Sequence, residues 1–262
     1  YLHSFPTRRS SDLSKALKLR SDISSNEQYI KNVDNGISWL NITETALRDI
    51  GDTLQRAREL TVRAAHETLV PADRAAVADE IEQLQRHLFQ LGNSTYAGRY
   101  IFSGFRTDAP AFAEISPGAI TFQGNNGEIA FEVSISNRIA VNVNGGEGGA
   151  EIAEVYDVLE RLKNDLRDPA MLPAGGYIQE IDQRINQVLA QRSTVGAKIN
   201  RFDMIRTRLM DSEVNYTELL SKNEDVDIAR TIMHLKEAEV VYNASLAAGA
   251  RIIMPSLVDF LR

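Results

Sequence analysis

The chain has 262 residues, of which 43% are apolar and 25% are charged, so it can bury a core in one or two domains. Its formal net charge of -7 disfavours nucleic acid as the main partner, because binding a phosphate backbone needs a surplus of clustered Lys and Arg. It has no cysteine, which excludes disulfides, thiolate metal sites and catalytic thiols.

The first segment, Tyr1 to Leu13, has no sustained helical period and differs in character from everything after Ser14. We interpret residues 1–13 as a non-native segment and leave them out of the fold prediction. The N-terminus lacks the continuous apolar core of a cleavable secretion signal, and no run of about 18 apolar residues predicts a membrane span. We therefore expect no membrane partner.

Two amphipathic helices are predicted next. The first runs from Leu17 to about Ala65, with apolar side chains in steps of three, four or seven: Ile30, Val33, Ile37, Leu40, Leu47 and Leu54. Leu69, Val70 and Pro71 break the pattern. The second helix, expected to return antiparallel to the first, carries Val77, Ile81, Leu84, Leu88 and Leu91.

A small β-rich module is predicted over residues 101–149. Gly92 and Asn93 end the second helix, and the stretch 96–112 is rich in aromatic residues and glycine without a helical period. Val, Ile and Phe cluster or alternate in 119–122, 128–134 and 138–143, and the segment 124–127 is predicted to be a tight hairpin turn between the first two of these strands. The glycine run 145–149 bounds the module.

Helix returns over 150–166 and again from Ile181, where a strict period of 3.5 predicts a coiled-coil seam. The steps of four and three also take in Ile185, Arg192, Arg206, Glu213 and Leu220. A final run with the same rhythm, interrupted by Glu239 and Gly249, makes the C-terminal arm a second candidate. The residues predicted to pack in these seams are Ile181, Val188, Val195, Ile199, Phe202, Leu209, Tyr216, Ile228, Ile232, Leu235, Tyr242, Leu246 and Ile253.

The predicted fold is mainly α: a long antiparallel helical rod, a coiled-coil-like bundle formed by both chain ends, with a small β-rich inserted domain. The domains are the N-terminal rod helices (14–100), the outer module (101–149), the C-terminal rod helices (150–220) and the inner coiled-coil arm (221–262). A C-terminal seam rich in small residues should be helical only when neighbours cover it.

No pattern supports an enzyme, a metal site or a cofactor site. The four histidines (His3, His66, His87 and His234) are isolated, and no HExxH or Glu-x-x-His arrangement is present. The glycine run lacks the Lys and Ser or Thr of a phosphate-binding loop. The acidic residues Glu224, Asp225 and Asp227 are interpreted as capping the following helix rather than binding a cation.

Two sets of residues leave alternatives open. Arg192, Arg206 and Glu213 either select register and neighbour within the seam or extend to solvent. The aromatic residues Tyr96, Tyr100, Phe102 and Phe105 form either a subunit contact or, as we favour, local packing at the end of the core.

Three segments carry a resemblance to a known family. Residues 34–41 (DNGISWLN) with 54–60 (LQRAREL) resemble the first rod helices of the bacterial flagellin superfamily, and 195–202 (VGAKINRF), 224–229 and 255–261 resemble its C-terminal helices. Within the superfamily, residues 93–104 (NSTYAGRYIFSG) are most similar to the hook-filament junction proteins, hook-associated protein three. The motif residues are Tyr96, Gly98, Tyr100, Ile101, Phe102, Ser103 and Gly104.

The resemblance implies an extracellular structural subunit of the flagellum, exported through the flagellar type III pathway without a cleavable signal. Its implied partners are the other hook-filament junction protein, flagellin, further copies of itself in a ring, and an export chaperone on the C-terminal helix. It would adapt the hook to the filament and be required for motility. The alternative is a short flagellin that forms the filament itself.

Overall fold

The computed structural model describes the backbone of residues 5–65, 70–116, 118–146, 149–168, 175–224 and 228–253. The helices are α1 (Phe5–Ala64), α2 (Pro71–Gly92), α3 (Ile152–Arg167), α4 (Gly175–Glu224) and α5 (Ile228–Ile253). The strands are β1 (Thr95–Tyr96), β2 (Arg99–Tyr100), β3 (Phe112–Ser116), β4 (Ala119–Phe122), β5 (Ala130–Ser134) and β6 (Asn137–Ala140).

The chain forms two compact units. The bundle unit comprises residues 24–213. The terminal unit combines the described residues up to Ile23 with those from Val214 onwards. Most of α1 and α4, together with α2, α3 and all six strands, therefore belongs to the bundle unit.

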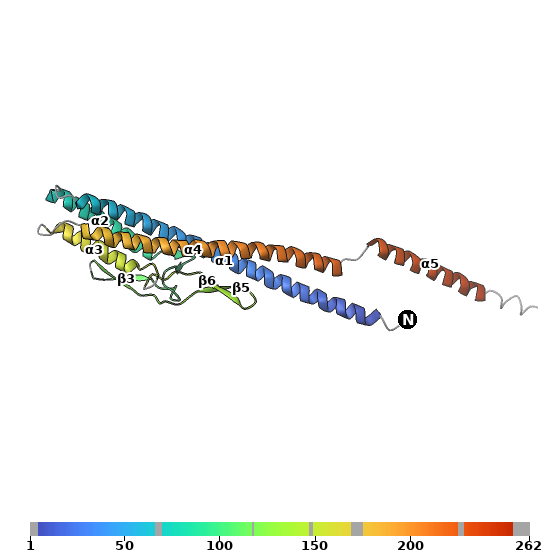
Figure 1. Ribbon diagram of the computed structural model, residues 1–262. Helices are drawn as coiled ribbons and strands as arrows, with labels where there is room; N and C mark the ends of the chain where they lie inside the picture. Colours follow the sequence, from blue (N-terminus) through green and yellow to red (C-terminus); the bar gives the residue numbers. More distant parts are fainter. Residues whose placement is uncertain are drawn as a thin grey trace, which may run out of the picture. The chain divides into compact units, whose positions relative to one another are not determined.

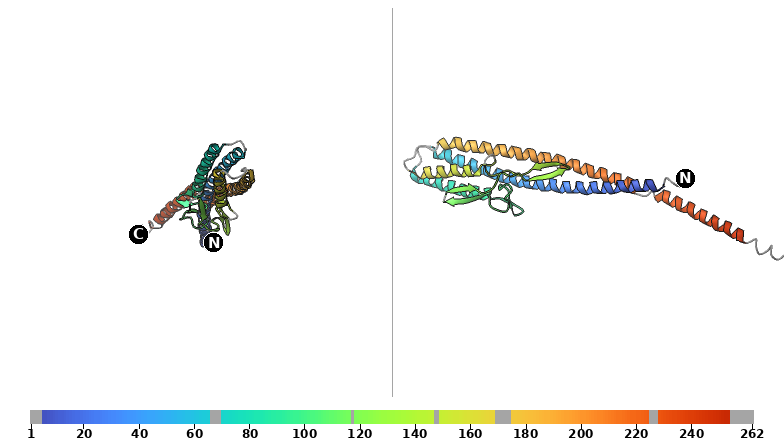
Figure 2. Two further views of the ribbon diagram at one scale, coloured as in Figure 1. Left: turned by 90° about the vertical axis from the view of Figure 1, so that its left-hand side faces the viewer. Right: turned by 90° about the horizontal axis from the view of Figure 1, so that it is seen from below.

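In the bundle unit, α1 and α4 run antiparallel, as Figures 1 and 2 show. Ion pairs fix their register: Glu44 meets Arg192 Nη2 at 2.7 Å, and Arg58 Nε meets Asp182 at 2.5 Å. Partner numbers fall along α4 as residue numbers rise along α1, as antiparallel pairing requires. The predicted fold class, mainly α with long antiparallel helices from both chain ends and a β-rich insert, is confirmed.

Apolar side chains at heptad spacing build the core between these helices. Leu40, Leu47 and Leu54 on α1 are at most 1% exposed, and Val188 and Phe202 on α4 are equally covered. Each fully buried side chain of this size contributes about 1.5–3 kcal/mol, so these positions stabilise the contact between α1 and α4.

One point in this interface depends on a glycine. A Cβ atom added to Gly36 would lie 2.5 Å from Phe202 Cε1, and two further ring atoms would lie within 3.2 Å. The absence of a side chain in α1 therefore lets the ring of Phe202 lie directly against the α1 backbone.

The predicted α4 seam is wrong at one position. The strict repeat continued from Phe202 to Arg206, but the buried residue is Ile205, whereas Arg206 is exposed and its Nε meets Asp34 Oδ1 at 3.0 Å. A straight helix drifts relative to a perfect 3.5 repeat, and a step of three brings the apolar side chain to the core.

The β-rich insert consists of three two-stranded antiparallel hairpins, β1–β2, β3–β4 and β5–β6. The β3–β4 and β5–β6 hairpins lie on one side of the helices (Figure 1). The predicted hairpin through residues 124–127 is wrong, because β4 and β5 do not pair. Instead, Asn125 faces the loop after β2: its N–H donates to Ser103 O at 3.1 Å, and its Oδ1 accepts the N–H of Phe105 at 2.8 Å.

The insert leaves and rejoins the helices at one place. A Cβ atom on Gly92, the last residue of α2, would lie 2.9 Å from Phe112 Cδ2 and 3.3 Å from Ile152 Cγ2 at the start of α3. Asn93 fastens β3 at this point: its Nδ2 donates to Phe112 O at 3.0 Å, and its Oδ1 accepts the N–H of Phe112 at 2.9 Å.

Helix α1 begins at Phe5, so the backbone of residues 5–13 is helical although their sequence has no helical period. Their interpretation as a non-native segment stays a prediction. The break predicted before α2 agrees with the first position of that helix, Pro71, where the missing N–H costs nothing. Asp225 and Asp227, which were predicted to cap the following helix, lie outside the described residues.

Candidate assembly site

The predicted α4 seam is covered by this chain itself within the bundle unit. Ile199 is partly buried and packs against the core. Tyr216, in the terminal unit, is partly exposed. The fully buried members of the seam are Ile181, Val188, Val195, Phe202 and Leu209, none more than 6% exposed.

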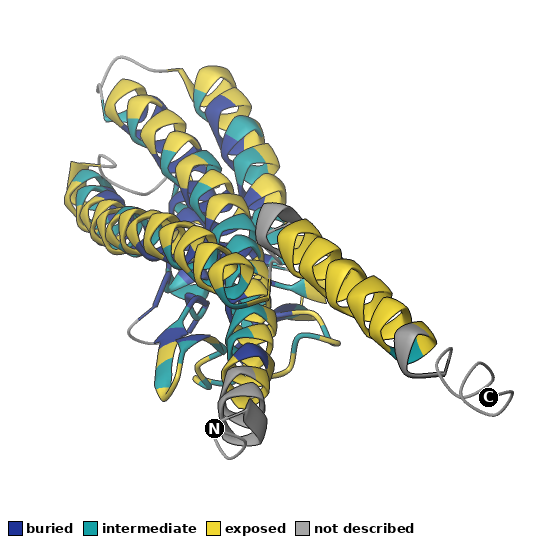
Figure 3. Cartoon of the chain, turned by 90° about the vertical axis from the view of Figure 1, so that its right-hand side faces the viewer, coloured by how far each residue is buried: buried dark blue, intermediate teal, exposed yellow. Residues whose placement is uncertain are grey.

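The predicted seam of α5 differs, because its side chains are exposed. Ile232 and Leu246 are 53% and 55% exposed, Leu235 is 57% exposed and Tyr242 is 65% exposed. Figure 3 shows this exposure over the described part of the helix, residues 231–250, in which all residues except Gly249 are exposed. The side chains of Ile228 and Ile253 lie outside the described residues.

A second apolar stripe on α5 was missed by the sequence analysis. Met233 is 60% exposed, Val240 is 67% exposed and Val241 is 64% exposed, and none of them belongs to the predicted seam. The sequence did contain a pattern that could have revealed this stripe, since Met233, Val240 and Ala247 repeat every seventh residue as the seam does. Helix α5 thus carries apolar residues on two faces.

Other apolar side chains of the terminal unit are exposed as well, although Ala16 is buried. Leu13 and Leu17 on α1 are 62% and 59% exposed, and Val214 and Leu219 on α4 are 68% and 51% exposed. Within this unit Arg20 Nη2 meets Glu224 Oε2 at 2.8 Å. Apolar surface of this extent on consecutive helices is the usual mark of a protein–protein contact.

The arginines of the predicted seam pair with α1. Arg192 contacts Glu44 through both Nε and Nη2, at 3.2 and 2.7 Å, and Arg206 contacts Asp34. These pairs are partly exposed, so each contributes about 0.2–1 kcal/mol to stability. They link the two helices of one chain, while selection of a neighbour by these residues stays a prediction.

The predicted motif of residues 96–104 folds as a tight turn between β1 and β2 followed by a buried, irregular segment of bends. Ala97 and Gly98 take positive φ angles of 49° and 76° between β1 and β2. Tyr96 packs edge-on against Trp39 of α1, with ring centroids 5.9 Å apart. Tyr100, at the end of β2, is partly exposed.

The second half of the motif is fully covered. Ile101, Phe102 and Ser103 are 0% exposed, and Ser103 Oγ donates to Ala109 O at 3.0 Å. Gly104 takes a φ of 66°, and a Cβ atom there would lie 1.9 Å from Asn125 O. These residues pack within the chain, whereas Phe105 is 64% exposed.

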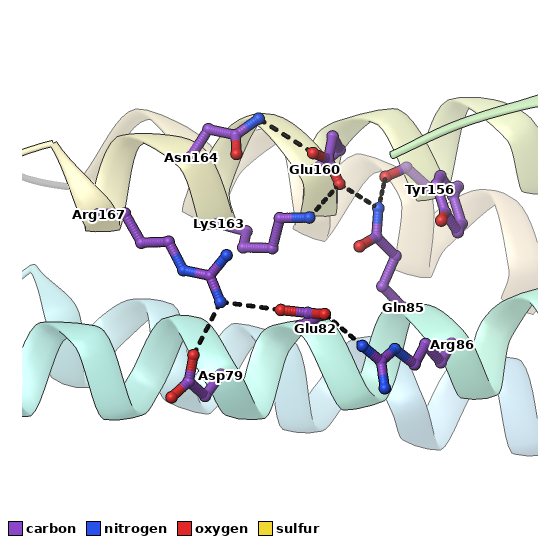
Figure 4. A network of polar contacts seen from close by, with 9 residues as sticks. All are labelled: Asp79, Glu82, Gln85, Arg86, Tyr156, Glu160, Lys163, Asn164 and Arg167. Atoms are coloured by element: carbon purple, nitrogen blue, oxygen red, sulfur yellow. Dashed lines mark hydrogen bonds and ion pairs between the residues drawn. The ribbon is translucent and has the colours of Figure 1, made fainter. Parts of the chain in front are cut away.

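A polar cleft of about 610 Å³ lies between α2, α3 and the β3–β4 hairpin. Glu160 Oε2 on its wall accepts hydrogen bonds from Lys163 Nζ at 2.5 Å and from Gln85 Nε2 at 2.8 Å, and Oε1 accepts one from Asn164 at 3.0 Å (Figure 4). Burial alone would raise the pKa of Glu160, but these hydrogen bonds outweigh it and lower the pKa below its usual value.

Beside this cluster, Arg167 Nη2 bridges Asp79 and Glu82 at 2.8 Å each (Figure 4). The contacts of Gln85 with Glu160 and of Arg167 with Asp79 and Glu82 thus bind α3 to α2, which is a structural arrangement. Within the described part of the chain, three or more His, Asp and Glu side chains do not gather in a way that could hold a metal ion. Among the described residues there is no helix with the length and hydrophobicity that a membrane span requires.

Comparison with known proteins agrees with this architecture. The bacterial flagellin N-terminal helical region matches residues 7–107, and the bacterial flagellin C-terminal helical region matches residues 178–261. Flagellin of Bacillus subtilis is 28% identical over 89% of this chain and 79% of its own length. Flagellar hook-associated protein 3 of Escherichia coli is 24% identical over 90% of this chain and 81% of its own length.

Solved structures show the same fold. FlgL of Bacillus cereus superimposes with a TM-score of 0.68 at 22% identity, covering 78% of this chain and 99% of that one. The chain is therefore a flagellar structural protein. It belongs to the bacterial flagellin family, and its relatives include a flagellar hook-associated protein.

Proposed function

We propose that this chain is the adapter of the hook-filament junction, placed between the other junction protein on the hook and the first layer of flagellin, and required for motility. The observation that carries the proposal is the fold, which follows FlgL of Bacillus cereus over nearly all of that protein. The similarity of hook-associated protein 3 over most of both chains supports it.

The exposed apolar helix α5 is the proposed assembly surface. A helix whose apolar side chains are more than half exposed contributes little to its own chain and gains from burial against a neighbour. In the flagellum, further copies of this chain, arranged in a ring, cover this surface. Before export through the type III pathway, an export chaperone covers the same C-terminal helix.

The second candidate is a short flagellin. The 28% identity to the Bacillus subtilis flagellin favours it. The segment 96–104, which resembles that of the junction proteins, favours the adapter. A filament subunit and an adapter differ in which missing protein they replace, so genetics separates them.

The test expresses the chain in two strains, one lacking its hook-filament junction protein and one lacking flagellin. The adapter restores filaments and swimming only in the first strain. Filaments in the second strain, with bare hooks and secreted flagellin in the first, would establish the filament subunit instead.

A matched pair of substitutions tests the assembly surface in the same strains. Leu235→Glu places a charge in the α5 seam and should abolish filament growth. Val241→Glu makes the same kind of change at a residue of similar exposure about a third of a turn away from the seam, and should do so less. Equal effects would contradict the predicted seam.

A further inference from the structure

Three Asn–Gly pairs occur in the sequence: Asn35–Gly36, Asn126–Gly127 and Asn144–Gly145. In such a pair the glycine offers no side chain to hinder attack of its backbone nitrogen on the side-chain amide of the asparagine. The nitrogen bonds to Cγ, the amide nitrogen leaves as ammonia, and a succinimide ring forms. Water then opens the ring to aspartate or isoaspartate.

Two of the three pairs are held in geometries that oppose this attack. Gly36 is buried within α1, where its N–H belongs to the helical hydrogen-bond ladder. Gly145 is also buried, and its N–H donates to Phe102 O at 3.0 Å. The amide oxygen of Asn144 accepts a hydrogen bond from Asn142 at 3.1 Å.

Asn126 differs from both. It lies in the irregular segment between β4 and β5, where its side chain is exposed, and Gly127 is only partly buried, whereas Gly36 and Gly145 are buried. We propose that Asn126 is the site at which the folded chain deamidates, and that the side chain of Asn125 sets the rate.

Asn125 acts on the attacking nitrogen. Its Oδ1 accepts the N–H of Gly127 at 2.9 Å and the N–H of Phe105 at 2.8 Å. The attack requires Gly127 N to give up its proton and move towards Cγ of Asn126. The hydrogen bond to Asn125 opposes both steps, because it stabilises the protonated nitrogen and fixes its direction.

Asn142 holds the carbonyl side of Gly127. Its Nδ2 donates to Gly127 O at 2.8 Å, and its Oδ1 accepts the N–H of Ile129 at 2.8 Å. Isoaspartate at residue 126 would lengthen the main chain by one methylene group and shift Gly127 away from both asparagines. Deamidation would therefore loosen the contact between the 124–129 segment and the loop after β2.

The experiment incubates the purified full chain at mildly alkaline pH and follows the three pairs separately by peptide mass mapping, with isoaspartate as the product measured. We expect the product at Asn126 alone. Asn125→Ala should raise its rate on the order of tenfold, equivalent to about 1.4 kcal/mol. Asn125→Asp keeps an oxygen acceptor for both N–H groups and should stay close to the wild-type rate.

Asn35 and Asn144 serve as internal controls for loss of structure. If Asn125→Ala merely unfolded the unit, these two residues would deamidate as well and the fluorescence of Trp39 would change, which would overturn the assigned role of Asn125. An unchanged rate at Asn126 in that variant would overturn it too. Deamidation of the wild-type chain first at Asn35 or Asn144 would overturn the site itself.

Discussion

Replacing Gly36 by Ala tests the contact between α1 and α4 most sharply, because the sign of the effect depends on the structure. In an open helical position, Gly→Ala stabilises a helix by about 0.8–1 kcal/mol. At Gly36 the new methyl group would lie 2.5 Å from Phe202 Cε1, in a site where Phe202 is 0% exposed. Overpacking of this kind costs about 1–3 kcal/mol. The expected net result is a destabilisation of about 1 kcal/mol.

Gly196 supplies the matched control, because it lies inside α4 and a Cβ atom there meets no described atom within 4 Å. Gly196→Ala should therefore raise the free energy of unfolding by about 0.8–1 kcal/mol. Urea unfolding followed by the fluorescence of Trp39 measures both, since Trp39 is the single tryptophan, is 4% exposed and belongs to the bundle unit. Equal stabilisation by the two variants would refute the packing of Phe202 on α1.

Three further predictions use the same fluorescence assay. Asn93→Ala removes both hydrogen bonds to Phe112 and should cost about 2 kcal/mol; a loss under about 0.5 kcal/mol would contradict the role given to them. The pKa of Glu160 is lower in the folded chain than in the unfolded chain, so its carboxylate stabilises the fold above the unfolded pKa, and this stability is lost as the pH falls through the folded pKa. Glu160→Gln should therefore make the free energy of unfolding depend less on pH below about pH 4.5. Burial lowers the pKa of Lys198 although Glu128 opposes this, so its charged form is disfavoured in the fold and Lys198→Met should stabilise the chain near neutral pH; a loss would show that Lys198 is paired in solution.

The helices were predictable because their apolar period is long, although polar residues such as Arg192 interrupt it. A repeat sustained from Ile181 to Leu209 leaves little freedom in which face turns inward. The error at Arg206 shows the limit of a strict period: Arg206 pairs with Asp34 at the surface, and Ile205 takes the buried position in the seam. Which of these two neighbouring residues is buried depends on the partner helix, which the period of α4 does not describe.

The insert was less predictable because distant contacts decide its hairpins. A glycine-rich turn at residues 124–127 suggested local pairing, but Asn125 instead bonds to Ser103 and Phe105 far back in the chain. The β5–β6 turn contains Ile135 and Ser136, which lack the usual turn signal. On α5, the second apolar stripe with Met233 and Val240 was missed, although these residues repeat every seventh position as the predicted seam does.

Because Gly92 and Ile152 lie close together, the length of the insert does not affect the geometry of the bundle. The two ends of the insert meet at one place, so its length can change without pulling α2 away from α3. Closing a longer flexible loop costs only about 0.6 kcal/mol for each doubling of its length. Relatives with larger or smaller inserts can therefore keep the same helices, and a reporter domain could be grafted between α2 and α3 of this chain.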